Sequence, residues 1–466
     1  MALGRRRKQQ QELLISTTSL PQSPGHPFYE KLNDLLRGAK FDEHVEDLCA
    51  PFYADRRGRP SIPPGVYFRM LFVGYFEGIG SQRGIAWRCA DSRSLQEFLG
   101  LQATDRTPDH SSLTVIRKRL PTEVHEEVFC FVVKVAGEKG LLKGKTLAVD
   151  ATTLEANAAM KSIVRRDSGA DWNEYLRELA QEAGIEEPSD EDLRRFDRGR
   201  KGKKVSNKDW VSRTDPESRI TKMKDGRTHL AYKAEHAVDL ESEIVVAGGV
   251  YQADQSDGDT APETVIEAEA VLAAIEHDQG IDEVVADKGY HKTETLAWFA
   301  DRGIRSYIPE RRDSHKRRWT NKAPSWKKAF RNNRRRVRGA RSKALQKLRS
   351  ERVERSFAHA CESGGGRRTW LSGVIDTHKR YVILLAAMNL GTILRAALGV
   401  GTPRELADRL RPAIDTVLAA FWRLWGLLTD SRPSIDAART IPGKSLSSLC
   451  PVLFGTRSAH RPAAVA

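Results

Sequence analysis

The chain has 466 residues, more than a single hydrophobic core usually organises, so its length predicts more than one folding unit. Hydrophobic residues make up 39% and charged residues 30%, which excludes a collagen-like or largely disordered chain. The 77 Lys and Arg exceed the 62 Asp and Glu and give a net charge of +15. An excess of this size favours a polyanionic partner, most simply nucleic acid.

The positive charge is concentrated in one part of the chain. The segment Arg311–Arg352 holds eighteen Lys or Arg and two acidic residues, so it carries the whole excess. A run of like charges is often only a solvated loop. Whether this segment binds DNA therefore depends on which residues it flanks.

Cysteine usage and apolar runs indicate the compartment. The five cysteines are widely spaced without a CxxC pair, which fits a reducing cytoplasm and indicates neither a disulfide framework nor a thiolate zinc site. The basic N-terminus lacks the apolar region of a signal peptide. The apolar run 381–400 is interrupted by Asn389 and Arg395, and it predicts a buried helix rather than a membrane span.

The first part of the chain is predicted to be helical. Residues 1–27 form a basic, flexible N-terminus, and residues 28–137 form a helical domain that we expect to bind DNA. One of its helices begins at Thr107 or Asp109 and ends in the three cations of residues 117–119. Such short helices are compatible with a helix-turn-helix module and with a plain helical bundle, and the pattern alone favours the bundle.

From residue 145 the apolar period changes to that of strands. Strands are predicted at 147–152, 229–240, 243–253, 282–290 and 304–310, with helices at 262–278 and 293–303. Three strands followed by alternating helices and strands imply an α/β fold with a mixed sheet flanked by helices. This succession is that of the RNase H-like fold, in which the first and fourth strands are neighbours.

We assign this fold to residues 143–398. Long polar insertions are expected at 153–228, with a helix near 170–184, and at 311–348. Residues 399–466 are predicted to be a C-terminal helix and a flexible tail.

Acidic residues follow the apolar parts of two of the predicted strands. Asp150 follows LAV and Asp287 follows VVA, so neighbouring strands would deliver both carboxylates to one edge of the sheet. A third acid is expected from the helix ERVERSFAHACE, where Glu354 is the preferred candidate and Glu351 the competing one. Three carboxylates can hold two hard divalent cations, Mg²⁺ above all, for phosphodiester chemistry. A lone aspartate at a strand end is more often a turn residue, so the interpretation depends on the order of the acids and the basic flank together.

Several segments together resemble a known family. They are VDATTLEANA (149–158), DPESRITKMKDGRTHLAYKAEHAVD (215–239), VVADKGYHK (284–292), ERVERSFAHACESGGGRRTWLSG (351–373) and KRYVILLAAMNL (379–390). In these segments the chain resembles bacterial insertion-sequence transposases with a DDE catalytic domain. The resemblance implies that Asp150, Asp287 and Glu354 are the catalytic triad and metal ligands, with two Mg²⁺ ions that Mn²⁺ can replace.

The sequence also departs from the pattern of many relatives. They carry a Tyr and an Arg before the catalytic Glu and a Lys after it, whereas here no Tyr precedes Glu354 nearby and Cys361 stands seven residues after it. Basic residues around the second and third acids are expected to contact phosphates without reading sequence. These residues are Lys288, Arg317, Arg318, Lys327, Lys328, Arg334, Arg335, Arg336, Arg338, Arg349, Arg352 and Arg355. Trp319 and Trp326 are candidates for stacking on a flipped base, and burial is the stronger expectation.

The expected function is that of a cytoplasmic, nucleoid-associated transposase. It would bind the terminal inverted repeats of its element as a homodimer on double-stranded DNA, cut phosphodiester bonds and join the 3′-hydroxyl to target DNA, with no membrane partner. Two alternatives stay open: a metal-dependent nuclease of the same fold that cuts without joining, and a catalytically silent DNA-binding regulator descended from a transposase.

Overall fold

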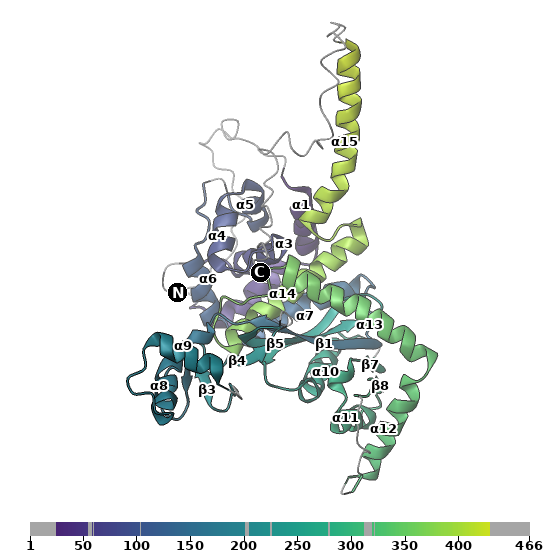
Figure 1. Cartoon of the computed structure of the whole chain (residues 1–466). Helices are drawn as coiled ribbons and strands as arrows, with labels where there is room; N and C mark the ends of the chain where they lie inside the picture. The colour runs from purple at the N-terminus through teal and green to yellow at the C-terminus, as the bar shows by residue number, and fades with distance from the viewer. Residues whose placement is uncertain are drawn as a thin grey trace. The chain divides into compact units, whose positions relative to one another are not determined.

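The computed structural model describes residues 25–54, 58, 60–102, 104–200, 205–223, 226–277, 280–311, 319–320 and 322–428. The chain divides into two compact units, one ending at Leu406 and one beginning at Ala407. The second contains most of α15 (Pro403–Leu428). All other elements below belong to the first unit (Figure 1).

The N-terminal region is a helical bundle. Its elements are α1 (Pro27–Gly38), α2 (Phe41–Cys49), the 3-10 turn η2 (Ala50–Phe52), α3 (Pro64–Phe76), α4 (Gln82–Ala90), α5 (Arg93–Leu99), α6 (His110–Arg119) and α7 (Thr122–Glu138). Side-chain oxygens of Ser81, Ser92 and Asp109 cap α4, α5 and α6, because each accepts a hydrogen bond from a backbone N–H of the first turn. Of the two residues proposed to begin the last of these helices, Asp109 is therefore the cap.

The basic last turn of α6 is turned largely into the protein. Arg117 is buried and forms an ion pair of 3.1 Å with Asp376, and the guanidinium of Arg119 lies over the ring of Tyr53. Lys118 is exposed. This turn therefore connects the bundle to the helix that carries Asp376. Two of its three cations have partners inside the protein, so they are not free to enter a DNA groove.

A mixed sheet forms the centre of the first unit. Its strands are β1 (Thr146–Glu155), β4 (Arg219–Lys222), β5 (Thr228–Asp239), β6 (Val245–Gln252), β7 (Glu283–Val285) and β8 (Arg305–Tyr307). The order is β4-β5-β1-β7-β8, with β6 paired to the second half of β5. β1 is antiparallel to β5 and parallel to β7, so the expected neighbourhood of the first and fourth strands is confirmed.

Helices cover both faces of this sheet. They are α10 (Asp257–Ala274), the 3-10 turn η4 (Lys288–Tyr290), α11 (Thr293–Asp301), α12 (Pro324–Val337), α13 (Ala340–Ala358), the π-helical turn η5 (His359–Ser363) and α14 (Val374–Leu398). Successive side chains of a strand point to opposite faces. On β5, Glu235 bonds to α10, and His236 bonds to α13 and α14, so these helices lie on opposite faces (Figure 1).

The long insertion after β1 has structure of its own. It contains the turn η3 (Met160–Ser162), β2 (Ile163–Arg165), α8 (Trp172–Glu182), α9 (Asp190–Gly199) and β3 (Trp210–Ser212). β2 pairs with β3, and Leu176, Ala180 and Leu193 form a small separate core. The expected helix near 170–184 is present as α8. The segment outside the main sheet is shorter than 153–228, because β1 continues to Glu155 and β4 already pairs with β5.

The longest apolar helix packs in the core. The stretch Val374–Arg409 is long and apolar enough to cross a membrane by length and composition, but 67% of its most apolar window is buried inside the protein. α14 contacts α3, α7 and β6, and Asn389 bonds to both backbone groups of Val245. The helix therefore connects the N-terminal bundle to the sheet.

Candidate active site

Asp150 and Asp287 come together where β1 and β7 run side by side. Ala148 pairs with Val285, and each aspartate lies two residues further along its own chain. Asp150 lies in the middle of β1 rather than at the strand end that the sequence suggested, because β1 extends well past its short neighbour β7. Asp287 follows β7 and caps the turn η4, accepting a hydrogen bond of 2.6 Å from the Gly289 N–H. Parallel pairing thus places both carboxylates beside the part of β1 that extends past the end of β7.

Burial and two nearby acids raise the pKa of Asp150, and one arginine lowers it. Burial raises the pKa of its carboxyl group to about 6, and the negative charges of Asp287 and Asp257 raise the pKa as well. Arg349 of α13 opposes this, since its Nη1 donates a hydrogen bond of 2.7 Å to Asp150 Oδ2. The site is therefore a place where negative charge is crowded and only partly compensated.

The third predicted acid does not join these two. Glu354 is exposed, and its carboxylate accepts a hydrogen bond of 3.0 Å from Ser350, one turn earlier on α13. The competing candidate, Glu351, is exposed and pairs with Arg355. At about 100° per residue, Glu354 lies about 140° and Glu351 about 160° around α13 from Arg349, so both project away from the side of the helix that contacts Asp150. The preference for Glu354 over Glu351 rests on the sequence and stays a prediction.

A carboxylate that sequence reasoning missed lies beside Asp287. A Cβ at Gly289 would lie 2.5 Å from Asp257 Oδ2 and 2.8 Å from Asp287 Oδ1, so two acidic oxygens converge on this glycine. Asp257 is in the first turn of α10, and its Oδ1 pairs with Lys233 Nζ at 2.9 Å. In the sequence it lies five residues before the predicted helix 262–278 and looks like an ordinary loop residue, because α10 begins earlier than predicted. The sequence feature that could have led to Asp257 is in the predicted strand 229–240, where the charged residues Lys233 and Glu235 occupy the same face among apolar neighbours.

The chemistry of the donor set fits a hard divalent cation. Asp150, Asp257 and Asp287 offer carboxylate oxygens, the ligands that Mg²⁺ prefers, and Gly289 leaves space between two of them. Within the described residues no three His, Cys, Asp or Glu side chains are grouped closely enough to hold a metal ion. In this structure Asp150 is paired with Arg349, and Asp257 is paired with Lys233.

The predicted DNA-binding residues divide into two groups, and the first is held by partners inside the protein. Arg336 donates to Ser306, Arg349 to Asp150 and Arg352 to the Leu240 carbonyl. Arg341, a neighbour that was not among the predicted residues, makes two hydrogen bonds to the buried Glu283. We call Arg336, Arg341, Arg349 and Arg352 the inner arginines. Arg334 and Arg355 make more exposed pairs with Glu310 and Glu243.

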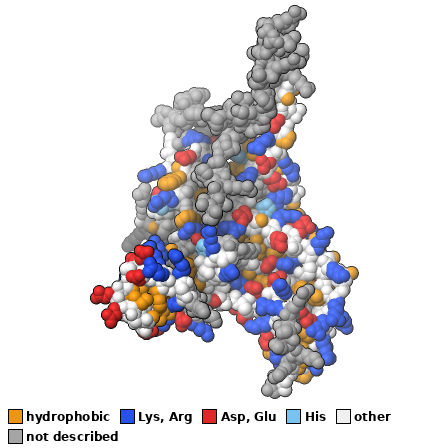
Figure 2. Space-filling model, in the orientation of Figure 1, with side chains coloured by type: hydrophobic (Ala, Val, Ile, Leu, Met, Phe, Trp, Pro, Cys, Tyr) orange, Lys and Arg blue, Asp and Glu red, His pale blue; other side chains and the backbone are white. Residues whose placement is uncertain are grey.

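The second group faces outward from α12. The predicted residues Lys328, Arg335 and Arg338 are exposed, and so is Arg331, which was not among the predicted residues. The four follow one another at spacings of three and four residues along α12 and its C-cap Arg338, which places them on one side of the helix. None of the four makes an ion pair within the described part of the chain. We call them the outer stripe. Figure 2 shows Lys and Arg side chains gathered over α12 and α13, at the lower right of the view.

The remaining predicted residues are placed as follows. Lys288 is exposed directly after Asp287, and Lys327 is half-buried on α12. Arg317 and Arg318 lie outside the described residues. Trp319 packs edge-on against Phe330, the Lys322 ammonium lies over the ring of Trp326, and both tryptophans are half-buried.

Comparison with known protein families locates two matches. A family described as a transposase DDE domain matches residues 143–390, more than half of the chain, and one described as a transposase domain (DUF772) matches residues 19–119. The first match covers the sheet and both aspartates, and the second covers most of the N-terminal bundle. No curated protein and no solved structure matches the chain.

Proposed function

We propose the function of this chain from its family, since the chain belongs to the DDE transposases, phosphoryl-transfer enzymes that act on DNA and generally use divalent metal ions. Our proposal is that it binds the terminal inverted repeats of a mobile element, cuts phosphodiester bonds at the element ends with activated water, and transfers the new 3′-hydroxyl into target DNA. Work on two ends in one complex requires two active sites, so we propose a homodimer on DNA.

One observation carries this proposal. Two aspartates from adjacent parallel strands converge where β7 ends. The strongly basic helices α12 and α13 follow later in the chain, and α13 contacts both strands. A phosphodiester needs both properties at one place: crowded carboxylates for divalent cations and positive charge for the flanking phosphates.

The proposed roles follow from where each residue lies. Asp150 and Asp287 hold the metal ions, and Glu354 is the proposed third ligand from α13. The bound ions would activate the attacking oxygen and stabilise the leaving oxygen. Arg349 keeps Asp150 compensated before an ion arrives, because an isolated buried carboxylate is costly. The outer stripe neutralises phosphates beside the site without reading sequence.

Cleavage of DNA with the genuine element ends tests the proposal. The DNA flanking the coding sequence supplies the substrate, and Mg²⁺ or Mn²⁺ is added to the wild type and to Asp150→Asn, Asp287→Asn and Glu354→Gln. We expect cleavage by the wild type and at least about a thousandfold less by each variant. Glu351→Gln is the matched control and should cleave normally. Loss of cleavage in Glu351→Gln with retention in Glu354→Gln would exchange the two assignments.

A plasmid integration assay separates the proposal from the nuclease alternative. A transposase yields joined products at target DNA, whereas a nuclease yields cut ends alone. Specific binding to the element ends without cleavage in either metal would instead identify a silent regulator.

A further inference from the structure

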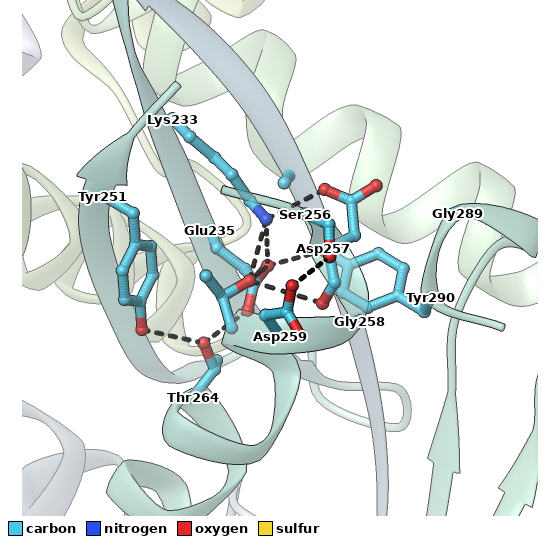
Figure 3. A network of polar contacts seen from close by, with 12 residues as sticks. Lys233, Glu235, Tyr251, Ser256, Asp257, Gly258, Asp259, Thr264, Gly289 and Tyr290 are labelled. Carbon is cyan, nitrogen blue, oxygen red and sulfur yellow. Dashed lines mark hydrogen bonds and ion pairs between the residues drawn. The ribbon is translucent and has the colours of Figure 1, made fainter. Parts of the chain in front are cut away.

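A buried lysine lies directly beneath the acidic site. Lys233 of β5 is 4% exposed, and its side chain points to the α10 face of the sheet (Figure 3). Its ammonium donates a hydrogen bond of 2.8 Å to Thr260 and forms ion pairs of 2.9 Å with Asp257 and 3.3 Å with Glu235. A buried ammonium ion is tolerated only when it is paired in this way. Lys233 is thus fixed by three partners, two on α10 and one on its own strand.

Its partner Glu235 extends the contacts to the turn that carries the second aspartate. Glu235 is fully buried and accepts hydrogen bonds of 2.7 Å from Thr260, 2.5 Å from Thr264 and 2.9 Å from the Tyr290 hydroxyl. Tyr290 closes the turn η4 that begins directly after Asp287. Through one carboxylate, Lys233 is therefore connected to the backbone segment that sets the place of Asp287.

The other partner of Lys233 faces Asp287 directly. Asp257 uses Oδ1 for Lys233, and its Oδ2 lies against Gly289 opposite an oxygen of Asp287. Two like-charged oxygens that converge on one glycine repel each other, so something must hold them in place. Lys233 holds the first and, through Glu235 and Tyr290, restrains the second.

We propose that Lys233 is a positioning residue of the acidic site, which fixes Asp257 and the Asp287 turn in the arrangement that receives a divalent cation. The inference rests on the proposed function in that Asp287 is taken as a metal ligand. Groups that orient metal ligands from behind commonly change metal affinity by about 10–100-fold when they are replaced. A lysine that served only to compensate Glu235 would have no such effect.

The decisive variant replaces the pair by neutral side chains of similar shape. Lys233→Met with Glu235→Gln removes one positive and one negative charge, so the net charge of the site is unchanged. A buried ion pair can often be replaced in this way without loss of stability. We expect normal thermal unfolding of the full-length double variant, but Mn²⁺ binding, measured by calorimetry without DNA, that is at least about tenfold weaker. Wild-type Mn²⁺ affinity in a folded double variant would overturn the proposal.

A second pair of variants covers the case in which the double variant does not fold. Tyr290→Phe removes the hydroxyl that connects Glu235 to the Asp287 turn and should weaken Mn²⁺ binding about three- to tenfold. Tyr251→Phe is the matched control, because its hydroxyl contacts Thr264 in the same network but away from that turn (Figure 3). Equal Mn²⁺ affinities of the two variants would contradict the proposal. The Mn²⁺ measurements contain no DNA, so they test the role of Lys233 independently of cleavage. Failure of the wild type to cleave DNA would refute the proposed function and leave this result unaffected.

Discussion

The inner arginines and the outer stripe come from one basic run of the sequence but occupy different environments. Arg341 and Arg349 contact the carboxylates of Glu283 and Asp150, whereas Arg331 and Arg335 project from α12 into solvent. The difference follows from packing, because one side of α13 lies against β1 and β7 and the side of α12 that carries Arg336 lies against β8. Positive charge in this segment therefore builds part of the acidic site, and we propose that the exposed part of it binds DNA.

The largest effect is expected from removing the carboxylate that an inner arginine compensates. Asp150→Asn should reduce cleavage at least about a thousandfold and leave DNA affinity unchanged. It should also stabilise the fold at pH 8. The folded pKa of about 6 lies above the ordinary value near 3.8, so the wild type loses stability as pH rises through this window and stays destabilised above it.

The size of that stabilisation follows from the pKa difference, which corresponds to about 2–3 kcal/mol. Urea unfolding at pH 4 and pH 8 measures it, and the gain should vanish at pH 4, where the wild-type carboxyl is largely protonated. A variant that is less stable than the wild type at pH 8 would show that the Arg349 pair outweighs the burial of Asp150.

The next effect concerns an inner arginine itself. Arg341→Gln leaves Glu283, which is 2% exposed, without its two-pronged partner. We expect a loss of about 2 kcal/mol in unfolding free energy, below the usual cost of breaking a buried pair because Arg341 is itself largely exposed. DNA affinity should stay within about threefold of wild type. Lys343→Gln, exposed on the same helix, is the control and should change stability by less than about 0.5 kcal/mol.

The fold and the two aspartates were predictable because they depend on local pattern. Apolar runs ending in Asp150 and Asp287, with helices between the later strands, imply neighbouring parallel strands, and β1 and β7 are paired in this way. The partners of the arginines were not predictable, because α12 and α13 carry similar basic residues and only their packing on the sheet separates them. Asp257 escaped for the same reason, since its relation to Asp287 depends on how α10 meets the turn at Gly289.

A smaller effect concerns the residue that holds α13 against β5. His236 is fully buried, bonds to Ser356 and Tyr381, and burial lowers its pKa to about 3. The stability it confers is complete above pH 6.5 and is lost as pH falls, by roughly 2 kcal/mol at pH 5. His236→Gln should remove this contribution to the pH dependence of stability. Unfolding at pH 5 and pH 7.5 is measured for Asp150→Asn with and without His236→Gln, because Asp150 titrates in the same window with the opposite sign. The difference between the two proteins gives the effect of His236, since His125 and Glu267, whose pKa values are also shifted, titrate in both. An unchanged pH dependence in His236→Gln would exclude His236 as its source.

The smallest effect separates the outer stripe from the inner arginines most directly. Arg331→Gln with Arg335→Gln removes two exposed cations that have no partner within the described residues. We expect DNA affinity to fall about tenfold for every sequence tested, and the slope of log affinity against log salt to decrease by about 2, because each lost phosphate contact releases about one counterion fewer. Unfolding free energy should be unchanged. Arg194→Gln with Arg198→Gln, exposed on α9, is the control of equal charge. If the control variant lowers DNA affinity and the salt slope as much as the outer-stripe variant does, the protein binds DNA through its total charge. The outer stripe would then not be a specific DNA-binding surface.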